Sequence, residues 1–277
     1  MKLVDKTILI TGGTSGIGYA LAKSLLGSGN TVIVTGRNLH ALEQARLALR
    51  GLHVMRSDVS DPAAITRLRD EVLGRFPALD VLINNAGIMR KLDFTAADEL
   101  VDVTPDVTAD VILDPTLYPI VDPTLDITRE IDINLSGPIR MTQQFLPHLQ
   151  SMSNAAIVNV SSGLAFVPFP QFPVYSATKA ALHAFSQALR VQLEHTSVRV
   201  IEVAPPGVKT PLFKNAFEGM FGMKTAMGAD SLAAVVIAAI EAGQDEIRPG
   251  ISQLLMIMSR IAPRFALKKM ARAGRKE

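Results

Sequence analysis

Tyr175 and Lys179 lie four positions apart in the stretch VYSATKAAL, which otherwise follows the pattern of an amphipathic helix. Four residues make about one helical turn, so the two side chains share a face and can act together. A free tyrosine has a pKa of about 10 and transfers protons poorly at neutral pH, but a nearby ammonium group favours the phenolate and lowers that pKa. The spacing therefore allows the lysine to act on the ionisation of the tyrosine, while a Tyr and a Lys at this spacing are also common on the surface of an ordinary amphipathic helix.

A second stretch that could do chemistry is TGGTSGIG, residues 11–18, which comes directly after an apolar run. Its glycines remove side chains where a backbone must turn tightly, approach a pyrophosphate and pack a helix on a strand. The amides at the start of the following helix can then hold the phosphate. Taken alone, the same glycines could form only a tight turn.

The elements that must position these residues alternate along the chain. Short β-branched runs are followed by helix-length amphipathic stretches, which predicts βαβ units and a parallel sheet. We expect an α/β fold, a Rossmann-like doubly wound sheet of about seven strands in a single domain over residues 1–250. The predicted strands are 6–11, 31–36, 52–58, 80–85, 155–162, 198–204 and 246–250, and the predicted helices are 16–28, 39–49, 61–75, 129–151, 174–195, 229–243 and 251–261.

The glycine spacing G-x-x-x-G-x-G resembles the short-chain dehydrogenase/reductase family rather than the commoner dinucleotide fingerprint. Further motifs of that family follow in order, so the resemblance covers residues 3 to 250 apart from one segment. The motifs are DV at 58–59, NNAG at 84–87, INL at 133–135, NVSS at 159–162, YSATK at 175–179 and PPGVKT at 205–210. In the last of these, PPGVKT, the threonine falls one residue earlier than in the family's P-G-x-x-x-T.

The resemblance implies a catalytic set of Asn134, Ser162, Tyr175 and Lys179. In the family, the tyrosine protonates a carbonyl oxygen as a hydride arrives, or deprotonates the alcohol in reverse, and the lysine also binds the nicotinamide ribose. Ser162 would hydrogen-bond the substrate oxygen and stabilise the charge that develops there. Asn134 would hold a water that connects Lys179 to bulk solvent. Singly, each residue has an ordinary structural explanation, such as a strand-end cap or a polar residue at the start of a helix.

The resemblance also implies a nicotinamide dinucleotide. An NAD-preferring site usually ends its second strand with a carboxylate, about 20 residues beyond the glycines. Residues 35–38 contain no carboxylate, and Arg37 can pair with a 2′-phosphate, which favours NADP(H) over NAD(H). An Arg37 that only faces solvent would instead leave an enzyme of dual specificity. Among the expected contacts, Asn85 and Gly87 would approach the adenosine ribose. The residues expected to bind the cofactor are Gly12, Thr14, Ser15, Gly16, Ile17, Gly18, Arg37, Asp58, Val59, Asn85, Gly87, Tyr175, Lys179, Pro206, Gly207, Val208 and Thr210.

The composition excludes other chemistries. The 277 residues include no cysteine, so a disulfide, a thiolate nucleophile and a Cys-ligated zinc site are impossible. The chain opens with MKLVDKTILIT, which does not resemble a signal peptide, and its longest apolar run, 233–240, is far shorter than the roughly 18 residues that span a bilayer. We therefore expect a cytoplasmic protein. The part before residue 260 carries a net charge of −4 and no nucleic-acid motif, so no nucleic-acid partner is expected.

Two charged segments depart from the alternating pattern. Residues 93–132 hold eleven acids and one base, and the segment 91–128 is rich in Pro and Thr, which indicates an acidic insertion. It has no glycine-containing EF-type loop, so a solvated lid or arm is favoured over a calcium site, and we expect no metal. Residues 251–277 are expected to form a basic helical tail. This tail could stay solvated, pack against another subunit, or make a peripheral contact with an anionic membrane.

Seven of the eleven phenylalanines lie between residues 166 and 221. In the family, the segments around the Ser–Tyr interval and after P-G-x-x-x-T form the substrate pocket and its mobile lid. Residues 164–174 and 212–223 are therefore the expected walls, and an apolar carbonyl or alcohol is the expected substrate. The alternative is ordinary core packing, which we expect for Phe185.

We therefore expect an NADP(H)-dependent oxidoreductase that transfers a hydride between nicotinamide and an apolar aldehyde or ketone, or the matching alcohol. The alternative is a catalytically weak NADP(H)-binding regulatory or scaffold protein, in which the acidic insertion covers the site or recruits a partner. Helices 129–151 and 174–195 resemble those through which members of the family associate, so a homodimer or homotetramer is expected.

Overall fold

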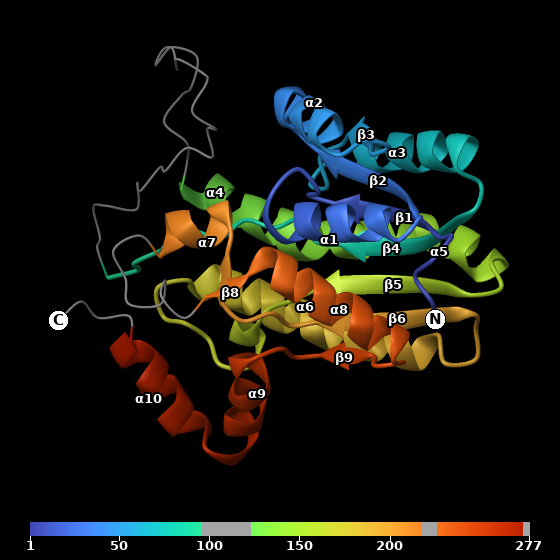
Figure 1. Ribbon diagram of the computed structural model, residues 1–277. Coiled ribbons are helices and arrows are strands. Elements are labelled where there is room, and N and C mark those ends of the chain that lie inside the picture. Colours follow the sequence, from blue (N-terminus) through green and yellow to red (C-terminus); the bar gives the residue numbers. More distant parts are fainter. Residues whose placement is uncertain (96–122, 218–225, 274–277) are drawn as a thin grey trace, which may run out of the picture.

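The computed structural model describes residues 1–95, 123–217 and 226–273. Its centre is a sheet of seven parallel strands in the order β3-β2-β1-β4-β5-β6-β9 (Figure 1). The chain leaves β1 in both directions across the sheet, and ligands bind at the carboxyl edge of such a switch point. The predicted doubly wound sheet of seven strands is confirmed. The strands are β1 Thr7–Thr11, β2 Thr31–Gly36, β3 His53–Arg56, β4 Leu79–Asn84, β5 Ala155–Val160, β6 Val198–Val203 and β9 Glu246–Ile247.

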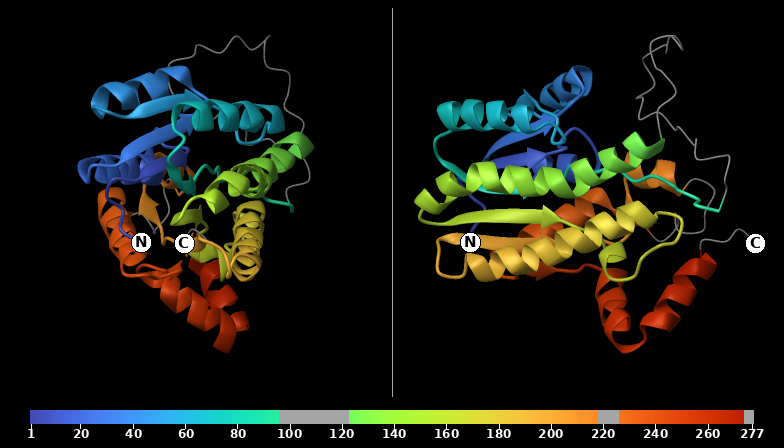
Figure 2. Two further views of the ribbon diagram at one scale, coloured as in Figure 1. Left: turned by 90° about the vertical axis from the view of Figure 1, so that its right-hand side faces the viewer. Right: turned by 180° about the vertical axis from the view of Figure 1, so that it is seen from behind.

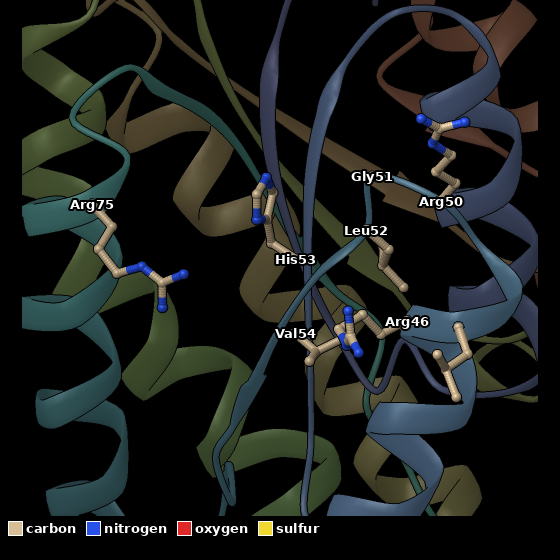
Figure 3. A pocket seen from close by; sticks show the side chains of 8 residues that line it. Arg46, Arg50, Gly51, Leu52, His53, Val54 and Arg75 are labelled. Carbon is tan, nitrogen blue, oxygen red and sulfur yellow. The ribbon is translucent and has the colours of Figure 1, made fainter.

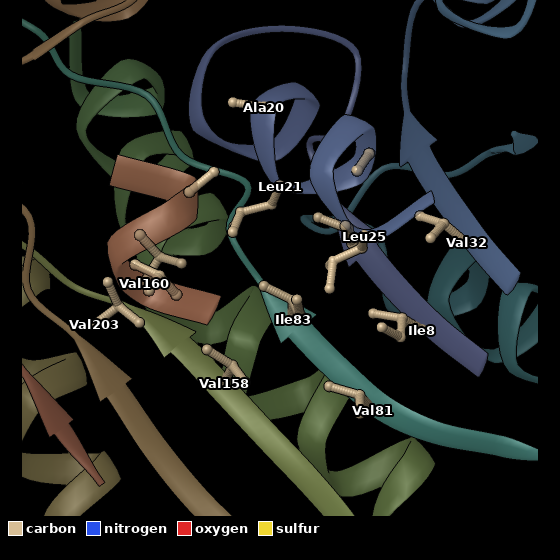
Figure 4. Packing of buried hydrophobic residues seen from close by; sticks show 14 of the residues in the cluster. Ile8, Ala20, Leu21, Leu25, Val32, Val81, Ile83, Val158, Val160 and Val203 are labelled. Carbon is tan, nitrogen blue, oxygen red and sulfur yellow. The ribbon is translucent and has the colours of Figure 1, made fainter. Parts of the chain in front are cut away.

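Helices cover both faces of the sheet (Figure 2). On one face, Leu21 and Leu25 of α1 are buried against Ile8, Val81 and Ile83 of the central strands (Figure 4). This apolar packing is what fixes the helices on the strands. The first face carries α1 Gly16–Gly27, α2 Leu39–Ala48 and α8 Ala229–Glu241. The second face carries α3 Pro62–Arg75, α5 Gly137–Ser151 and α6 Pro173–Gln192.

The helix predicted at 129–151 is divided. A helix α4, Pro123–Ile131, runs into one π-helical turn, Asp132–Ser136, and α5 follows from Gly137. A Cβ on Gly137 would lie 2.9 Å from the carbonyl oxygen of Val59, so this glycine lets the helix approach the loop after β3. Single π-helical turns inside α-helices are frequent at functional sites, and this one contains the predicted catalytic residue Asn134.

Small elements after β6 are absent from the sequence prediction. The strands β7, Val208–Lys209, and β8, Met227–Gly228, form a two-stranded parallel sheet, and a short helix α7, Pro211–Ala216, lies between them in the sequence. Two-residue strands leave no detectable alternation in a sequence, and they pair here because distant segments meet. The sequence prediction also lacks the 3-10 turn Gly163–Ala165 after β5, which is only three residues long.

The end of the described chain is a helical pair. α9, Ile251–Ile261, has the bounds predicted for it, and Pro263 then begins a further helix, α10, Pro263–Ala273. In Figure 1 the pair forms a V outside the α/β body. Among residues 1–95, 123–217 and 226–273, no helix is long and apolar enough to cross a membrane. Most of the predicted acidic insertion, the distal part of the wall 212–223 and residues 274–277 lie outside the described residues.

Candidate active site

Most of the predicted site residues lie at the carboxyl edge of the sheet. They occupy the segments that directly follow β1, β2, β3, β4, β5 and β6, and Tyr175 and Lys179 lie on helix α6, which follows the segment after β5. The segments are residues 12–18 after β1, Arg37 after β2, 58–59 after β3, 85–87 after β4, Ser162 after β5 and 206–210 after β6. Residues that are far apart in the sequence are thus brought to one edge.

The glycine loop after β1 is closed by steric contacts that only glycine allows. Gly12 has φ +66°, and a Cβ there would lie 2.8 Å from Cα of Ala86. A Cβ on Gly18 would lie 2.4 Å from the carbonyl oxygen of Gly12. The side-chain amide of Asn85 donates to the carbonyl oxygens of Thr11 and Gly12, both at 3.0 Å. Both amide hydrogens of Asn85 therefore hold the loop, a role that the sequence analysis did not assign to it.

The start of α1 presents backbone N–H groups at this loop. Ser15 is the N-cap residue, but its side chain makes no capping hydrogen bond, and the first turn contains no acidic residue. Gly16 has φ +56°, and Thr210 packs over it, because a Cβ on Gly16 would lie 3.1 Å from Cγ2 of Thr210. The hydroxyl of Thr210 accepts a hydrogen bond from the N–H of Phe213, at 3.2 Å, and caps α7. The glycine cradle and the helix amides together fit the pyrophosphate of a dinucleotide.

Arg37 and Asp58 meet beside the glycine loop. Nη1 of Arg37 lies 3.8 Å from Oδ2 of Asp58, and each side chain is about one-third exposed. The other oxygen of Asp58 accepts hydrogen bonds from the N–H and the hydroxyl of Ser60, at 2.9 and 2.7 Å. Arg56 donates to the carbonyl oxygen of Arg37 at 3.2 Å. A guanidinium and the carboxylate that pairs with it are therefore both positioned where β2 and β3 end.

Asn134 clamps the loop that follows β4. Its Oδ1 accepts from the N–H of Ile88 at 2.9 Å, and its Nδ2 donates to the carbonyl oxygen of Ile88 at 2.8 Å. Nδ2 also donates to Oγ1 of Thr178 on α6, at 3.3 Å. A Cβ on Gly87 would lie 3.2 Å from Oδ1 of Asn134 and 3.6 Å from Nζ of Lys179, so Gly87 lies close to both side chains. The π-helical turn thus joins the β4 loop to α6.

Ser162, Tyr175 and Lys179 come together as predicted. Tyr175 is 8% exposed and hydrogen-bonded to Ser162, whose hydroxyl also accepts from the N–H of Leu164 at 3.1 Å. Lys179 is 4% exposed, and its Nζ donates to the carbonyl oxygen of Val160 at 2.9 Å. That Nζ lies 5.6 Å from the centre of the Tyr175 ring. A phenol, a hydroxyl and a buried amine therefore share one site.

The ionisation of these groups is set mainly by burial. Burial raises the pKa of Tyr175 to about 12, although the hydrogen bond from Ser162 opposes this change. Burial also lowers the pKa of Lys179 to about 8. The prediction of a lowered pKa for Tyr175 is therefore wrong for this structure, because the loss of water around the phenolate outweighs the favourable contacts. An amine whose pKa is about 8 still holds its proton at neutral pH.

Glu130 is a titratable group that the sequence analysis missed at this site. It was counted with the acids of 93–132, yet it is 0% exposed. Burial raises its pKa to about 7, while Arg90 and Lys179 oppose the rise. The available signal was its spacing, because Glu130 precedes Asn134 by four residues, about one helical turn, and so shares its face.

Aromatic side chains pack beside Tyr175. The cluster joins the segment before α6 to α7 and to the C-terminal pair, since Met270 of α10 packs against it. The rings of Phe213 and Phe217 stack with centres 4.4 Å apart, and Phe172 lies 5.0 Å from Phe217. Both predicted walls therefore contribute to one apolar cluster next to Tyr175. Phe185 packs in the core of the second sheet face, as expected, and Phe221 lies outside the described residues.

Two hollows lie away from Tyr175. One, of about 630 Å³, is lined by three arginines and His53 at the amino end of β3, opposite the catalytic edge (Figure 3). Arg46 and Arg75 are already paired there with Glu43 and Glu71. The other, of about 220 Å³, lies between the loop of Phe166 and the C-terminal helices. Neither hollow contains a member of the predicted catalytic set.

Comparison with known proteins defines the class. The model of the short chain dehydrogenase family matches residues 6–109 and 121–220, and the chain belongs to this family of oxidoreductases. The chain is 43% identical over 212 residues to an uncharacterized oxidoreductase, DltE, of Bacillus subtilis, covering 76% of this chain and 75% of that one. The unmatched residues 110–120 fall inside the segment that was expected to be an insertion.

Solved structures agree with this assignment. A short chain dehydrogenase from Burkholderia cenocepacia in complex with NADP has a TM-score of 0.76 at 24% identity, covering 98% of this chain and 99% of that chain. A 3-ketoacyl-(acyl-carrier-protein) reductase from Brucella melitensis complexed with NADH has a TM-score of 0.70 at 25% identity, covering 86% and 91%. The first shares the fold, and both were solved with a nicotinamide nucleotide.

Proposed function

We propose that this protein is an NADP(H)-dependent oxidoreductase that interconverts an apolar aldehyde or ketone and the matching alcohol, with Tyr175 as the general acid and base. The observation that carries the proposal is the meeting of Ser162, Tyr175 and Lys179 beside the clamp of Asn134. These four side chains come from three separate segments, and each is buried at the edge where a glycine cradle opens.

The cradle fits a nicotinamide dinucleotide. Gly12 and Gly18 leave no space for a side chain, and the first N–H groups of α1 can hold a pyrophosphate. Asp58 and Val59 would receive the adenine, and Val208 with Thr210 would line the nicotinamide end. When bound, the reduced dinucleotide supplies the hydride. Arg37 supports a preference for NADP(H), because its guanidinium can pair with a 2′-phosphate once it turns from Asp58.

In the direction of reduction, Tyr175 donates its phenolic proton to the carbonyl oxygen while the carbonyl carbon receives the hydride. Ser162, already hydrogen-bonded to Tyr175, donates to the same oxygen and stabilises the negative charge that develops there. Lys179 carries a positive charge below about pH 8 and stabilises the phenolate that remains. In the direction of oxidation, Tyr175 accepts the proton of the alcohol.

The aromatic cluster supports an apolar substrate. Phe172, Phe213 and Phe217 offer rings rather than charges next to the reacting phenol. Aromatic walls favour substrates with apolar chains or rings over charged substrates, because they can bury the apolar surface of the substrate. Met270 lies on the same cluster, so the C-terminal helices take part in the wall.

The exposed face of α9 and α10 supports a role in association. Ile261 is 77% exposed and Phe265 is 59% exposed, and residues 249–273 contain five bases and no acid. Burial in a homodimer or homotetramer is the first candidate, and peripheral contact with an anionic membrane is the second. Removal of residues 263–277 should reduce oligomer size in the first case and binding to anionic vesicles in the second. No change in either would refute both roles.

The proposed activity is tested by NADPH oxidation with a panel of aldehydes and ketones of rising chain length and ring size. Tyr175→Phe should lower kcat/KM by about 100-fold to 10,000-fold, the usual contribution of a general acid. Tyr19→Phe, which makes the same chemical change on α1, should leave it unchanged. NADPH binding without turnover of any carbonyl would instead favour the alternative function, that of an NADP(H)-binding regulatory or scaffold protein with little catalytic activity.

A further inference from the structure

Glu130 is a buried acid that the proposed reaction does not use. It is 0% exposed, and among the residues that the structure describes neither carboxyl oxygen has a hydrogen-bond partner of normal geometry. The backbone N–H and the charge of Arg90 both act on the carboxyl and oppose the rise of its pKa. Leaving a carboxylate unpaired in a protein interior is costly, so its presence calls for a partner charge.

Two positive charges act on Glu130, that of Arg90 in the loop after β4 and that of Lys179 on α6. Glu130 lies one helical turn before Asn134, and α4 packs against both the π-helical turn and α6. Within residues 1–95, 123–217 and 226–273, the charged and titratable groups that act on it are Lys179 and Tyr175 on α6 and Arg90 in the loop after β4. Lys179 is itself 4% exposed and bonded to a neutral carbonyl, that of Val160. Glu130 and Lys179 are thus both buried on elements that pack against each other, and the charge of each acts on the pKa of the other.

We propose that Glu130 is a further positioning residue of this site: its carboxylate is the counter-charge that keeps Lys179 an ammonium and Tyr175 a phenol. The proposal rests on the proposed function, because Lys179 and Tyr175 are its means of action. A carboxylate beside these two groups favours the protonated form of each. Glu130 thereby prepares the site to give a proton, which is the form required for carbonyl reduction.

The structure also explains why the two charges act as a pair. Glu130 loses its proton near neutral pH, in the range where Lys179 still keeps its own. The site then contains a carboxylate and an ammonium, and the proton affinity of one depends on the charge of the other. Removing the carboxylate leaves Lys179 buried without its counter-charge, so Lys179 should lose its proton at a lower pH.

The experiment follows Lys179 directly and does not require turnover. Lysine labelled with ¹³C at Cε is introduced into the full chain, and the signal of Lys179, assigned by its absence in Lys179→Arg, is titrated by NMR. In Glu130→Gln the midpoint should fall by about one pH unit, a tenfold loss of proton affinity. Asp132→Asn is the matched control, because it removes an acid two residues away that is paired with Arg140 at 3.5 Å. It should leave the midpoint unchanged.

A second readout is the pH profile of kcat/KM for carbonyl reduction. Its alkaline limb should move to lower pH in Glu130→Gln. In Glu130→Asp, which keeps the charge, the limb should return most of the way to its wild-type position. If Glu130→Gln does not fold, Glu130→Met replaces it, since an apolar side chain of similar length removes the charge and its desolvation. An unchanged Lys179 midpoint in a folded neutral variant would overturn the proposal. A shifted midpoint in a chain that reduces no carbonyl would refute the oxidoreductase activity but not the pairing of Glu130 with Lys179.

Discussion

The glycine loop after β1 and helix α6, which carries the proposed catalytic residues, meet at the carboxyl edge of the same sheet, but different forces hold them. The loop is fixed by steric fit, since a Cβ on Gly18 would lie 2.4 Å from a carbonyl oxygen, and by neutral hydrogen bonds from Asn85. Around α6, the side chains of Tyr175, Lys179 and Glu130 are all ionisable and all buried. The first region is fixed by shape, and the second depends on protonation. Binding and chemistry should therefore respond to different perturbations.

The largest effect should come from the charges of the catalytic region. Burial raises the pKa of Glu130 from its ordinary value of 4.5 to about 7, so the native state holds this proton more tightly than the unfolded chain does. The protein therefore loses stability as the pH rises from about 4.5 to 7. Glu130→Gln carries no such proton, so its free energy of unfolding should rise relative to that of the wild type by up to about 3 kcal/mol across this range.

The measurement is urea unfolding of both proteins at several pH values in that range. The stability difference, variant minus wild type, should grow steadily with pH. A difference that does not change with pH would show that the carboxyl is not electrostatically strained, and the contrast between the two regions would disappear.

The next effect concerns the region held by shape. Gly18→Ala should destabilise the fold by about 1–3 kcal/mol, because the added methyl must displace backbone or the amide of Asn85. NADPH affinity should fall at the same time, since the displaced backbone is the cradle itself. The matched control is Gly27→Ala in the same helix, where a Cβ meets nothing within 4 Å. That variant should be more stable by about 0.4–1 kcal/mol. Equal behaviour of the two variants in thermal unfolding and NADPH titration would refute the steric account.

The smallest effect should be on the choice of nucleotide. Arg37→Ala should weaken NADPH binding by roughly tenfold, the value of one charge-assisted hydrogen bond, and leave NADH binding nearly unchanged. Fluorescence titration with both nucleotides measures the ratio. If both affinities fall together, Arg37 acts on the loop through its contact with Asp58 rather than on a 2′-phosphate.

The features that could be predicted from the sequence are those that depend on local pattern. The seven strands were predicted from apolar runs, and the glycine loop was predicted from the spacing of its glycines. The shared helical face of Tyr175 and Lys179 follows from their spacing, and the place of Ser162 beside them follows from the family resemblance. The structure brings these residues together with the geometry that the spacing implies.

The features that could not be predicted depend on contacts between distant segments. The pairing of β7 with β8 involves two residues on each side, and no periodicity can reveal it. Glu130 belongs to an acidic run, and although its spacing places it on the same helical face as Asn134, only the packing of α4 on α6 shows that it is buried. The pKa of Tyr175 is raised because the fold removes water from the phenol, an effect that a Tyr and Lys at helical spacing do not disclose.

The most direct test of the central claim is to measure cofactor binding and turnover on the same variant, Tyr175→Phe. If shape holds the dinucleotide and a protonated phenol does the chemistry, the Kd for NADPH should change far less than the rate of carbonyl reduction. Carbonyl reduction should fall by at least about 100-fold. Turnover that survives in this variant, or a loss of activity explained by lost NADPH binding, would contradict the separation of binding from proton transfer on which the proposed function rests.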